Sequence, residues 1–205
     1  ARRRISALQR YGSLGAGFKL ALKDLEIRGT GNLLGAEQSG HIGAIGFELY
    51  CQFLKRTVAR LQGQEVPPLI DVELKLPFLS LSTSSGEKAN GAVIPISYVE
   101  DEDLRVHAYR KVSTATTEPE IDHLFTEFAD RFGPVPPSLN RLLKTCRIRI
   151  LAASRDITSV ETRGDRVMMT RGNDYIKEGP KFPRLTERDA DNRLNQLIHI
   201  VRSAR

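Results

Sequence analysis

The chain of 205 residues contains no tryptophan and only two cysteines, and aromatic residues make up 6% of it. So few aromatic side chains offer little surface on which nucleic-acid bases could stack, which argues against a stand-alone nucleic-acid-binding module. Cys51 and Cys146 stand alone, without a CxxC spacing or a neighbouring histidine. We therefore expect both to be small buried apolar residues rather than metal ligands or redox groups.

Long apolar runs and targeting signals are missing as well. No apolar stretch approaches the roughly twenty residues of a transmembrane helix, and no signal-peptide or transit-peptide pattern is present. These features predict a cytoplasmic protein without a membrane partner.

The motifs of a nucleotide-hydrolysing site are also missing. The sequence has no phosphate loop of the Walker A type and no acidic motif for Mg²⁺. Its histidines are scattered, and none has the spacing of a zinc site. We predict that this chain alone is not an enzyme and needs no cofactor. Because Ala-Arg-Arg-Arg enters a helical pattern without a cap or an initiator methionine, we also expect a piece of a longer protein.

The positive charge is concentrated at the beginning of the chain. Residues 1–64 carry ten Lys or Arg and four Asp or Glu, a net charge of +6. Residues 65–205 carry twenty-one of each kind, a net charge of zero. This distribution favours contact between the first segment and a polyanion, although a solvated basic helix would show the same excess.

A glycine-rich stretch, Asp24 to Gly40, gives this basic segment its most unusual feature. Its sequence is DLEIRGTGNLLGAEQSG, and six glycines fall between Gly29 and Gly46. Glycine lets the backbone reach positive φ and approach other surfaces closely. Arg28 and Gln38 supply a planar cationic fork and an amide, which suit recognition of phosphate or carboxylate. The stretch is either an ordinary connecting loop or a loop whose conformation serves a function.

Sixteen contiguous residues, LEIRGTGNLLGAEQSG, resemble the loop after the second motor lobe of RecG-type and transcription-repair coupling helicases. In that family a helical hairpin and this loop couple ATP hydrolysis to translocation along duplex DNA. The resemblance implies that Arg4, Arg28 and Gln38 form the working trio. It also implies that ATP and Mg²⁺ bind to motor lobes of the parent protein. The loop glycines in the matching stretch are Gly29, Gly31, Gly35 and Gly40.

We predict two domains that meet at the stiff Pro67-Pro68 link. Residues 1–66 hold the helical hairpin, the loop and a helix ending near Gln62, whose apolar stripe, including Val58 and Leu61, should be core. Residues 67–205 form an α+β domain. Its expected elements are a strand at 71–76, helices at about 100–115, 118–132 and 137–154, a hairpin of strands 157–162 and 167–170, and a last helix capped by Thr186. Residues 80–91 should be disordered.

The second domain resembles the C-terminal domain of bacterial transcription-repair coupling factors. The segments IPISYVEDEDLRVHAYRK and FADRFGPVPPSLNRLL carry this resemblance. It implies a parent translocase that pushes on RNA polymerase stalled at DNA damage. It also implies that this domain folds back on the parent's own N-terminal module, which is similar to UvrB, and masks the surface that recruits UvrA.

One helix of the second domain carries a candidate docking face. Between Glu118 and Phe132 there are five acids and one Lys or Arg, and one helix face is apolar. We predict that Glu120, Glu127 and Asp130 form a docking face for the N-terminal module; the alternative is a solvated helix face. For the whole chain, the alternatives to a coupling factor are a RecG-type fork-remodelling helicase and a stand-alone basic nucleic-acid-binding module.

Overall fold

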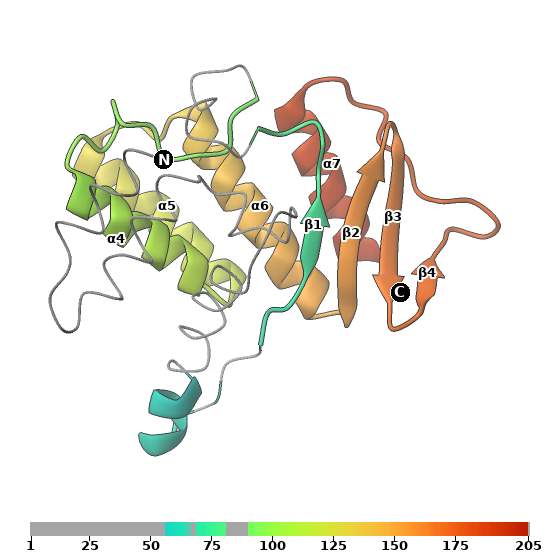
Figure 1. Cartoon of the computed structure of the whole chain (residues 1–205), viewed down its shortest axis with the longest axis horizontal. Helices are drawn as coiled ribbons and strands as arrows, with labels where there is room; N and C mark the ends of the chain where they lie inside the picture. Colours follow the sequence, from blue (N-terminus) through green and yellow to red (C-terminus); the bar gives the residue numbers. More distant parts are fainter. Residues whose placement is uncertain (1–55, 65, 67–68, 81–89, 205) are drawn as a thin grey trace, which may run out of the picture.

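The computed structural model describes residues 56–64, 66, 69–80 and 90–204, and the other residues are drawn in grey in Figure 1. Most of the predicted first domain therefore lies outside the described residues. In the described part, residues 56–61 form the end of a helix, and Gly63 stops it with a φ of 67°.

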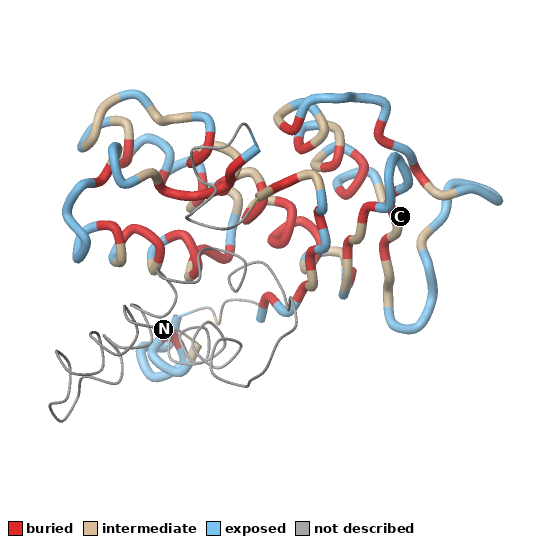
Figure 2. The backbone as a smooth tube through the Cα atoms, turned by 45° about the horizontal axis from the view of Figure 1, so that its top comes forward, coloured by how far each residue is buried: buried red, intermediate tan, exposed pale blue. Residues whose placement is uncertain are grey.

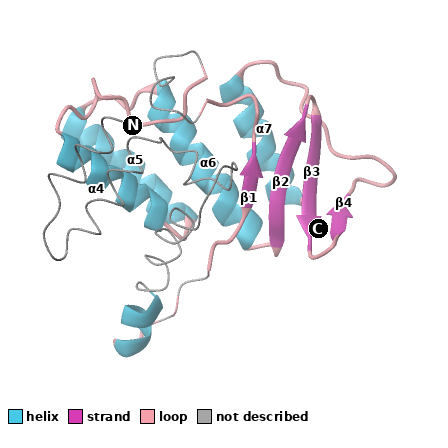
Figure 3. Cartoon of the chain, viewed as in Figure 1, coloured by secondary structure: helices cyan, strands magenta, loops and turns pink. Residues whose placement is uncertain are grey.

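The second domain has the predicted α+β arrangement (Figure 3). Each helix and strand named above has its counterpart, with ends that differ by a few residues, and one short strand is added. Along the chain the elements are β1 (Glu73–Lys75), α4 (Glu102–Thr114), α5 (Glu118–Phe132), α6 (Pro137–Ala153), β2 (Ile157–Arg163), β3 (Arg166–Arg171), β4 (Asp174–Ile176) and α7 (Ala190–Ser203).

The four strands form one mixed sheet in the order β1-β2-β3-β4. β1 runs parallel to β2, while β2, β3 and β4 follow one another as antiparallel hairpins. Gly164 makes the tight turn between β2 and β3 with a φ of 64°, a conformation that favours glycine. A row of paired residues on three strands, Leu74, Val160 and Met169, is buried, so this face of the sheet belongs to the core.

α6 is the central element of the domain. It contacts α4 and α5 on one side and α7 and β2 on the other, as Figure 1 shows. Leu139, Leu142 and Ile148 on α6 are completely buried. Figure 2 shows that buried residues run through the middle of the domain along this helix. The core therefore joins the α4–α5 pair to the sheet, and the two ends of the domain form one packed body.

Two predictions about helices are wrong. Leu61 is 82% exposed and Val58 is 42% exposed, whereas Ala59 in the same turn is buried, so the described end of that helix turns another face inward. The last helix begins four residues after Thr186. Leu185 is held beside β3, because its N–H donates to the carbonyl of Asp165. The chain then turns away from the sheet over the next residues before α7 begins. Asp189 then caps α7 by accepting from the N–H of Asn192.

The predicted disorder at 80–91 falls on residues 81–89, outside the described residues. The two ends of this segment are joined, because the Ser80 N–H donates to the Asn90 carbonyl and the Ala92 N–H donates to the Ser80 carbonyl. Arg141 on α6 donates to the Gly91 carbonyl at 3.3 Å and forms an ion pair with Asp191 on α7. In the described part of the chain, no helix is long and apolar enough to cross a membrane.

Candidate functional site

The residues predicted to act in translocation lie outside the described residues, so their roles stay predictions. This holds for the trio Arg4, Arg28 and Gln38 and for the loop glycines Gly29, Gly31, Gly35 and Gly40. The predicted docking face on α5, by contrast, is fully described.

α5 starts at a cap that uses one of the three predicted acids. Thr117 is the N-cap, and its hydroxyl accepts from the Glu120 N–H at 3.4 Å. The Glu120 carboxylate reaches back and accepts from the N–H of Thr116 at 2.6 Å. This reciprocal arrangement resembles a capping box, in which serine or threonine and glutamate satisfy free N–H groups at a helix start. Glu120 therefore fixes the start of α5.

Glu127 stands between α4 and α5 and is occupied by two cations. Its Oε1 lies 2.5 Å from Lys111 Nζ on α4 and 3.2 Å from an Arg131 guanidinium nitrogen one turn along α5. The hydrogen bond from Lys111, supported by the one from Arg131, lowers the pKa of Glu127 below its usual value of 4.5. The side chain is 22% exposed. Glu127 thus joins the two helices and remains charged at neutral pH.

Asp130 is exposed one turn after Glu127, and no ion pair or side-chain hydrogen bond involves it among the described residues. The guanidinium of the neighbouring Arg131 forms an ion pair with Glu127 and lies over the ring of Phe132. The ring centroid is 5.2 Å from the guanidinium carbon. The C-terminal half of α5 therefore presents a free carboxylate beside a fixed guanidinium. This arrangement suits a partner that offers an arginine together with an acceptor.

Tyr98, in the loop before α4, holds this end of α5 in position. Its hydroxyl lies 2.8 Å from the carbonyl oxygens of Phe128 and Gly133 and shares its hydrogen between them. Burial raises the pKa of Tyr98, so the donor keeps its proton. Its ring also packs against Phe132, with 5.8 Å between centroids. Gly133 ends α5 with a φ of 87°, a conformation that glycine adopts without strain.

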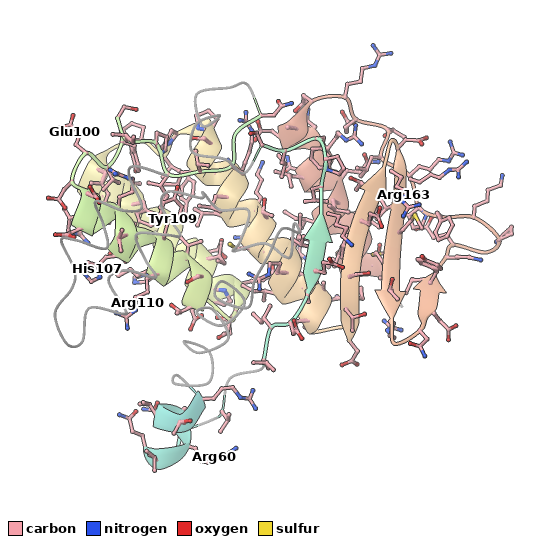
Figure 4. All side chains as sticks on the ribbon, viewed as in Figure 1. Arg60, Glu100, His107, Tyr109, Arg110 and Arg163 are labelled. Atoms are coloured by element: carbon pink, nitrogen blue, oxygen red, sulfur yellow. The ribbon has the colours of Figure 1, made fainter. Side chains whose placement is uncertain are left out.

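The remaining candidate metal ligands of the described part of the chain do not form a group. His107 on α4 and Arg163 on the sheet lie at opposite sides of the domain (Figure 4). Cys146 is buried, as predicted. Among the described residues, no group of three or more His, Cys, Asp or Glu could hold a metal ion. The side-chain interactions around α5 are ion pairs and hydrogen bonds.

Sequence reasoning placed the three acids on one helix but missed their partners. Lys111 is sixteen residues from Glu127, and Tyr98 is thirty from Phe128. Such contacts depend on how α4, α5 and the preceding loop pack. The only available signals were the Thr-x-x-Glu spacing of the cap and the glycine that ends the helix.

Comparison with known proteins gives consistent matches. Residues 90–179 match the family model described as TRCF domain. A transcription-repair-coupling factor of Myxococcus xanthus is 38% identical over 188 residues, which are 92% of this chain and 15% of that protein. Corresponding proteins of Haemophilus influenzae and Buchnera aphidicola are 36% and 31% identical, over 78% and 98% of this chain.

This chain therefore spans only a small part of these relatives, 13% of the Haemophilus protein and 25% of the Buchnera protein. Among solved structures, a crystal structure of the C-terminal domain of a transcription-repair coupling factor is similar, with a TM-score of 0.44 and 14% sequence identity. That similarity covers 64% of this chain and 94% of the solved chain.

Proposed function

Since this chain belongs to the family of transcription-repair coupling factors, we propose that it couples ATP-driven translocation along duplex DNA to the displacement of stalled RNA polymerase. In this proposal residues 1–66 carry the translocation hairpin and loop. The α+β domain of residues 67–205 is an autoinhibitory clamp on the parent's UvrB-like module and regulates recruitment of UvrA.

The basic first segment supports the role in translocation. Residues 1–64 hold the whole net charge of +6. Cationic side chains that contact the phosphates give a protein its sequence-independent affinity for duplex DNA. ATP and Mg²⁺ bind to the motor lobes of the parent, where the nucleotide is hydrolysed, and the loop transmits the resulting movement. The three relatives named above are coupling factors, which favours this family over the RecG-type alternative.

The observation that carries the clamp is the contrast between Glu127 and Asp130. Glu127 is neutralised by Lys111 and Arg131, whereas Asp130 is exposed and has no described partner. Asp130 is therefore the acid that a partner can reach without breaking an existing ion pair. Glu127 contributes by holding Arg131, and Tyr98 contributes by fixing the end of the helix.

The decisive experiment measures UvrA binding by the full-length parent protein. Asp130→Ala combined with Glu127→Ala should loosen the clamp, expose the masked surface and increase the affinity for UvrA. Each exposed pair contributes only about 0–1 kcal/mol, so the double change should exceed either single change. Asp130→Ala alone should have a larger effect than Lys111→Ala, which leaves Glu127 with Arg131.

Glu187→Ala is the matched control, because Glu187 is exposed before α7 and its carboxylate forms no ion pair or hydrogen bond with a described residue. It removes one negative charge without touching α5. If the double variant is folded and binds UvrA with the affinity of the unmodified protein, α5 is a solvated helix face and the clamp proposal is wrong.

A further inference from the structure

The sheet of the α+β domain has a second face that the described helices leave open. Leu74, Val160 and Met169 are buried against the core, and neighbouring residues along a strand point to opposite faces. The open face therefore carries the residues one position before or after them. Paired across the four strands, one row of this face consists of Glu73, Ser159, Thr170 and Tyr175.

Three arginines form another row on the same face, at the turn between β2 and β3. Arg163 is paired with Arg166, and Arg166 is paired with Arg184 of the returning chain. Side chains directly opposite one another lie on one face about 5 Å apart, and like charges in such positions repel. All three are exposed (Arg163 is labelled in Figure 4). An anion above this row would relieve the repulsion.

Acids neutralise only the outer arginines of this row. Arg163 donates to Glu161 at 2.7 Å, and Arg184 donates to Asp165 at 2.8 Å. Arg166, between them, forms no ion pair with any residue in the described part of the chain. The middle of the row therefore keeps an uncompensated guanidinium.

An exposed aromatic ring lies at the other end of the same face. Tyr175 on β4 is 52% exposed. Its ring packs edge-on with Phe182, with 5.5 Å between centroids, and Lys177 Nζ lies 5.5 Å from the centre of the Phe182 ring. The Tyr175 ring is thus supported by a neighbour while much of its surface remains accessible. A ring held in this way loses little freedom when another flat group stacks on it.

We propose that this open sheet face binds a short single-stranded nucleic acid, with its phosphates on Arg166 and Lys177 and a base stacked on Tyr175. Thr170, the partner of Tyr175, is four residues from Arg166 along β3, about 13 Å at the rise of a strand. A strand lying along β3 reaches both groups. Basic side chains that follow the backbone, together with aromatic rings for the bases, are the usual means of binding single strands.

The combination of groups favours this ligand over other anions. A duplex can contact the arginines but keeps its base faces stacked inside. An acidic peptide offers carboxylates to Arg166 but no flat ring for Tyr175. The zero net charge of residues 65–205 does not argue against the site, because charge is distributed unevenly over the domain: Glu118 to Phe132 on α5 hold five acids and one Lys or Arg. On the open face, Arg166 and Lys177 form no ion pair with a described residue and remain available to an anion.

The test is fluorescence anisotropy of the whole chain with a fluorescein-labelled oligonucleotide of about 12 nucleotides, offered as DNA and as RNA. Tyr175→Ala should weaken binding about tenfold, the loss expected for one stacked base. Arg166→Gln should also weaken binding and reduce the slope of log affinity against log salt by about 0.7, the value for one phosphate contact on a single strand. The two affinities show whether the site prefers DNA or RNA.

Matched controls separate this site from the basic segment 1–64. Tyr175→Phe keeps the ring, and Arg202→Gln removes one positive charge from α7, on the covered side of the sheet. Both should bind within about twofold of the unmodified chain, since neither removes a proposed contact. Circular dichroism confirms that each variant is folded.

Two results would overturn the proposal. One is an unchanged single-strand affinity in Tyr175→Ala. The other is an Arg166→Gln variant that loses affinity equally for the single strand, for the same sequence as a duplex and for a polyglutamate competitor. Either result would show that this face does not bind single strands specifically and that the chain attracts polyanions in general.

Discussion

The Lys111 ammonium on α4 lies 2.5 Å from the Glu127 carboxylate on α5, and this pair joins the two helices beside the proposed docking face. Lys111 is 49% exposed and Glu127 is 22% exposed, so water screens the attraction. The pair therefore contributes at most about 1 kcal/mol to the stability of the domain.

The stabilisation by Glu127 should depend on pH. Its pKa is lower in the folded protein than the ordinary value of 4.5, so the folded state binds fewer protons than the unfolded state around that pH. The contribution is therefore present above 4.5 and is lost as the pH falls through the lowered pKa. At pH 7, Glu127→Gln should reduce the free energy of unfolding by up to about 1 kcal/mol.

Urea unfolding of both proteins over a range of pH measures this difference. The difference should disappear in strong acid, where both side chains are neutral. Glu187→Gln, which removes an exposed carboxylate without an ion pair to a described residue, should change the free energy of unfolding by less than about 0.5 kcal/mol. A difference between Glu127→Gln and the unmodified chain that persists undiminished in strong acid would show that the effect does not come from the ion pairs.

Removal of the Tyr98 hydroxyl should destabilise the domain. Tyr98→Phe keeps the ring against Phe132 but leaves the carbonyls of Phe128 and Gly133 without this donor, at a cost of about 1–2 kcal/mol in the free energy of unfolding. Tyr175→Phe is the matched control, because that side chain is exposed, and it should change stability by less than about 0.5 kcal/mol. Equal stabilities of the two variants would rule out a structural role for the Tyr98 hydroxyl.

A buried leucine and an exposed leucine should differ strongly in their response to truncation. Leu142 on α6 is completely buried, so Leu142→Ala should cost about 2–5 kcal/mol through lost burial and the cavity that remains. Leu61 is 82% exposed, and Leu61→Ala should change the free energy of unfolding by less than about 0.5 kcal/mol. A large loss at Leu61 would restore the original interpretation of that position as core.

In the full-length parent, Arg28→Ala or Gln38→Ala should impair displacement of RNA polymerase while ATP hydrolysis largely continues. A coupling loop acts after the chemical step, so its loss should separate the two activities. Polymerase-displacement and ATPase assays on the same preparations measure both. If Gln38→Ala displaced polymerase normally, the assignment of the loop to coupling would be incorrect. Stability should change by less than about 0.5 kcal/mol, as for most surface substitutions.

Local patterns in the amino-acid sequence were sufficient to predict most elements of the α+β domain. Alternation of Val72, Leu74 and Leu76 with charges indicated β1, and all three are buried. The apolar spacing from Ile121 to Phe128 indicated the buried face of α5. Strand and helix periods depend on residues close together in the chain, and the turn at Gly164 and the cap at Thr117 use residues within the same few positions.

The order of the strands, the partner of Glu127 and the row of three arginines depended on contacts between distant segments. β1 pairs with β2 across more than eighty residues, and Arg166 meets Arg184 because the chain after β4 returns to β3. The start of α7 at Ala190 follows from the same contact, which holds Leu185 beside β3. Periodicity shows which face of an element is apolar, but only packing of the assembled core determines which surface covers that face and which charges come together on the outside.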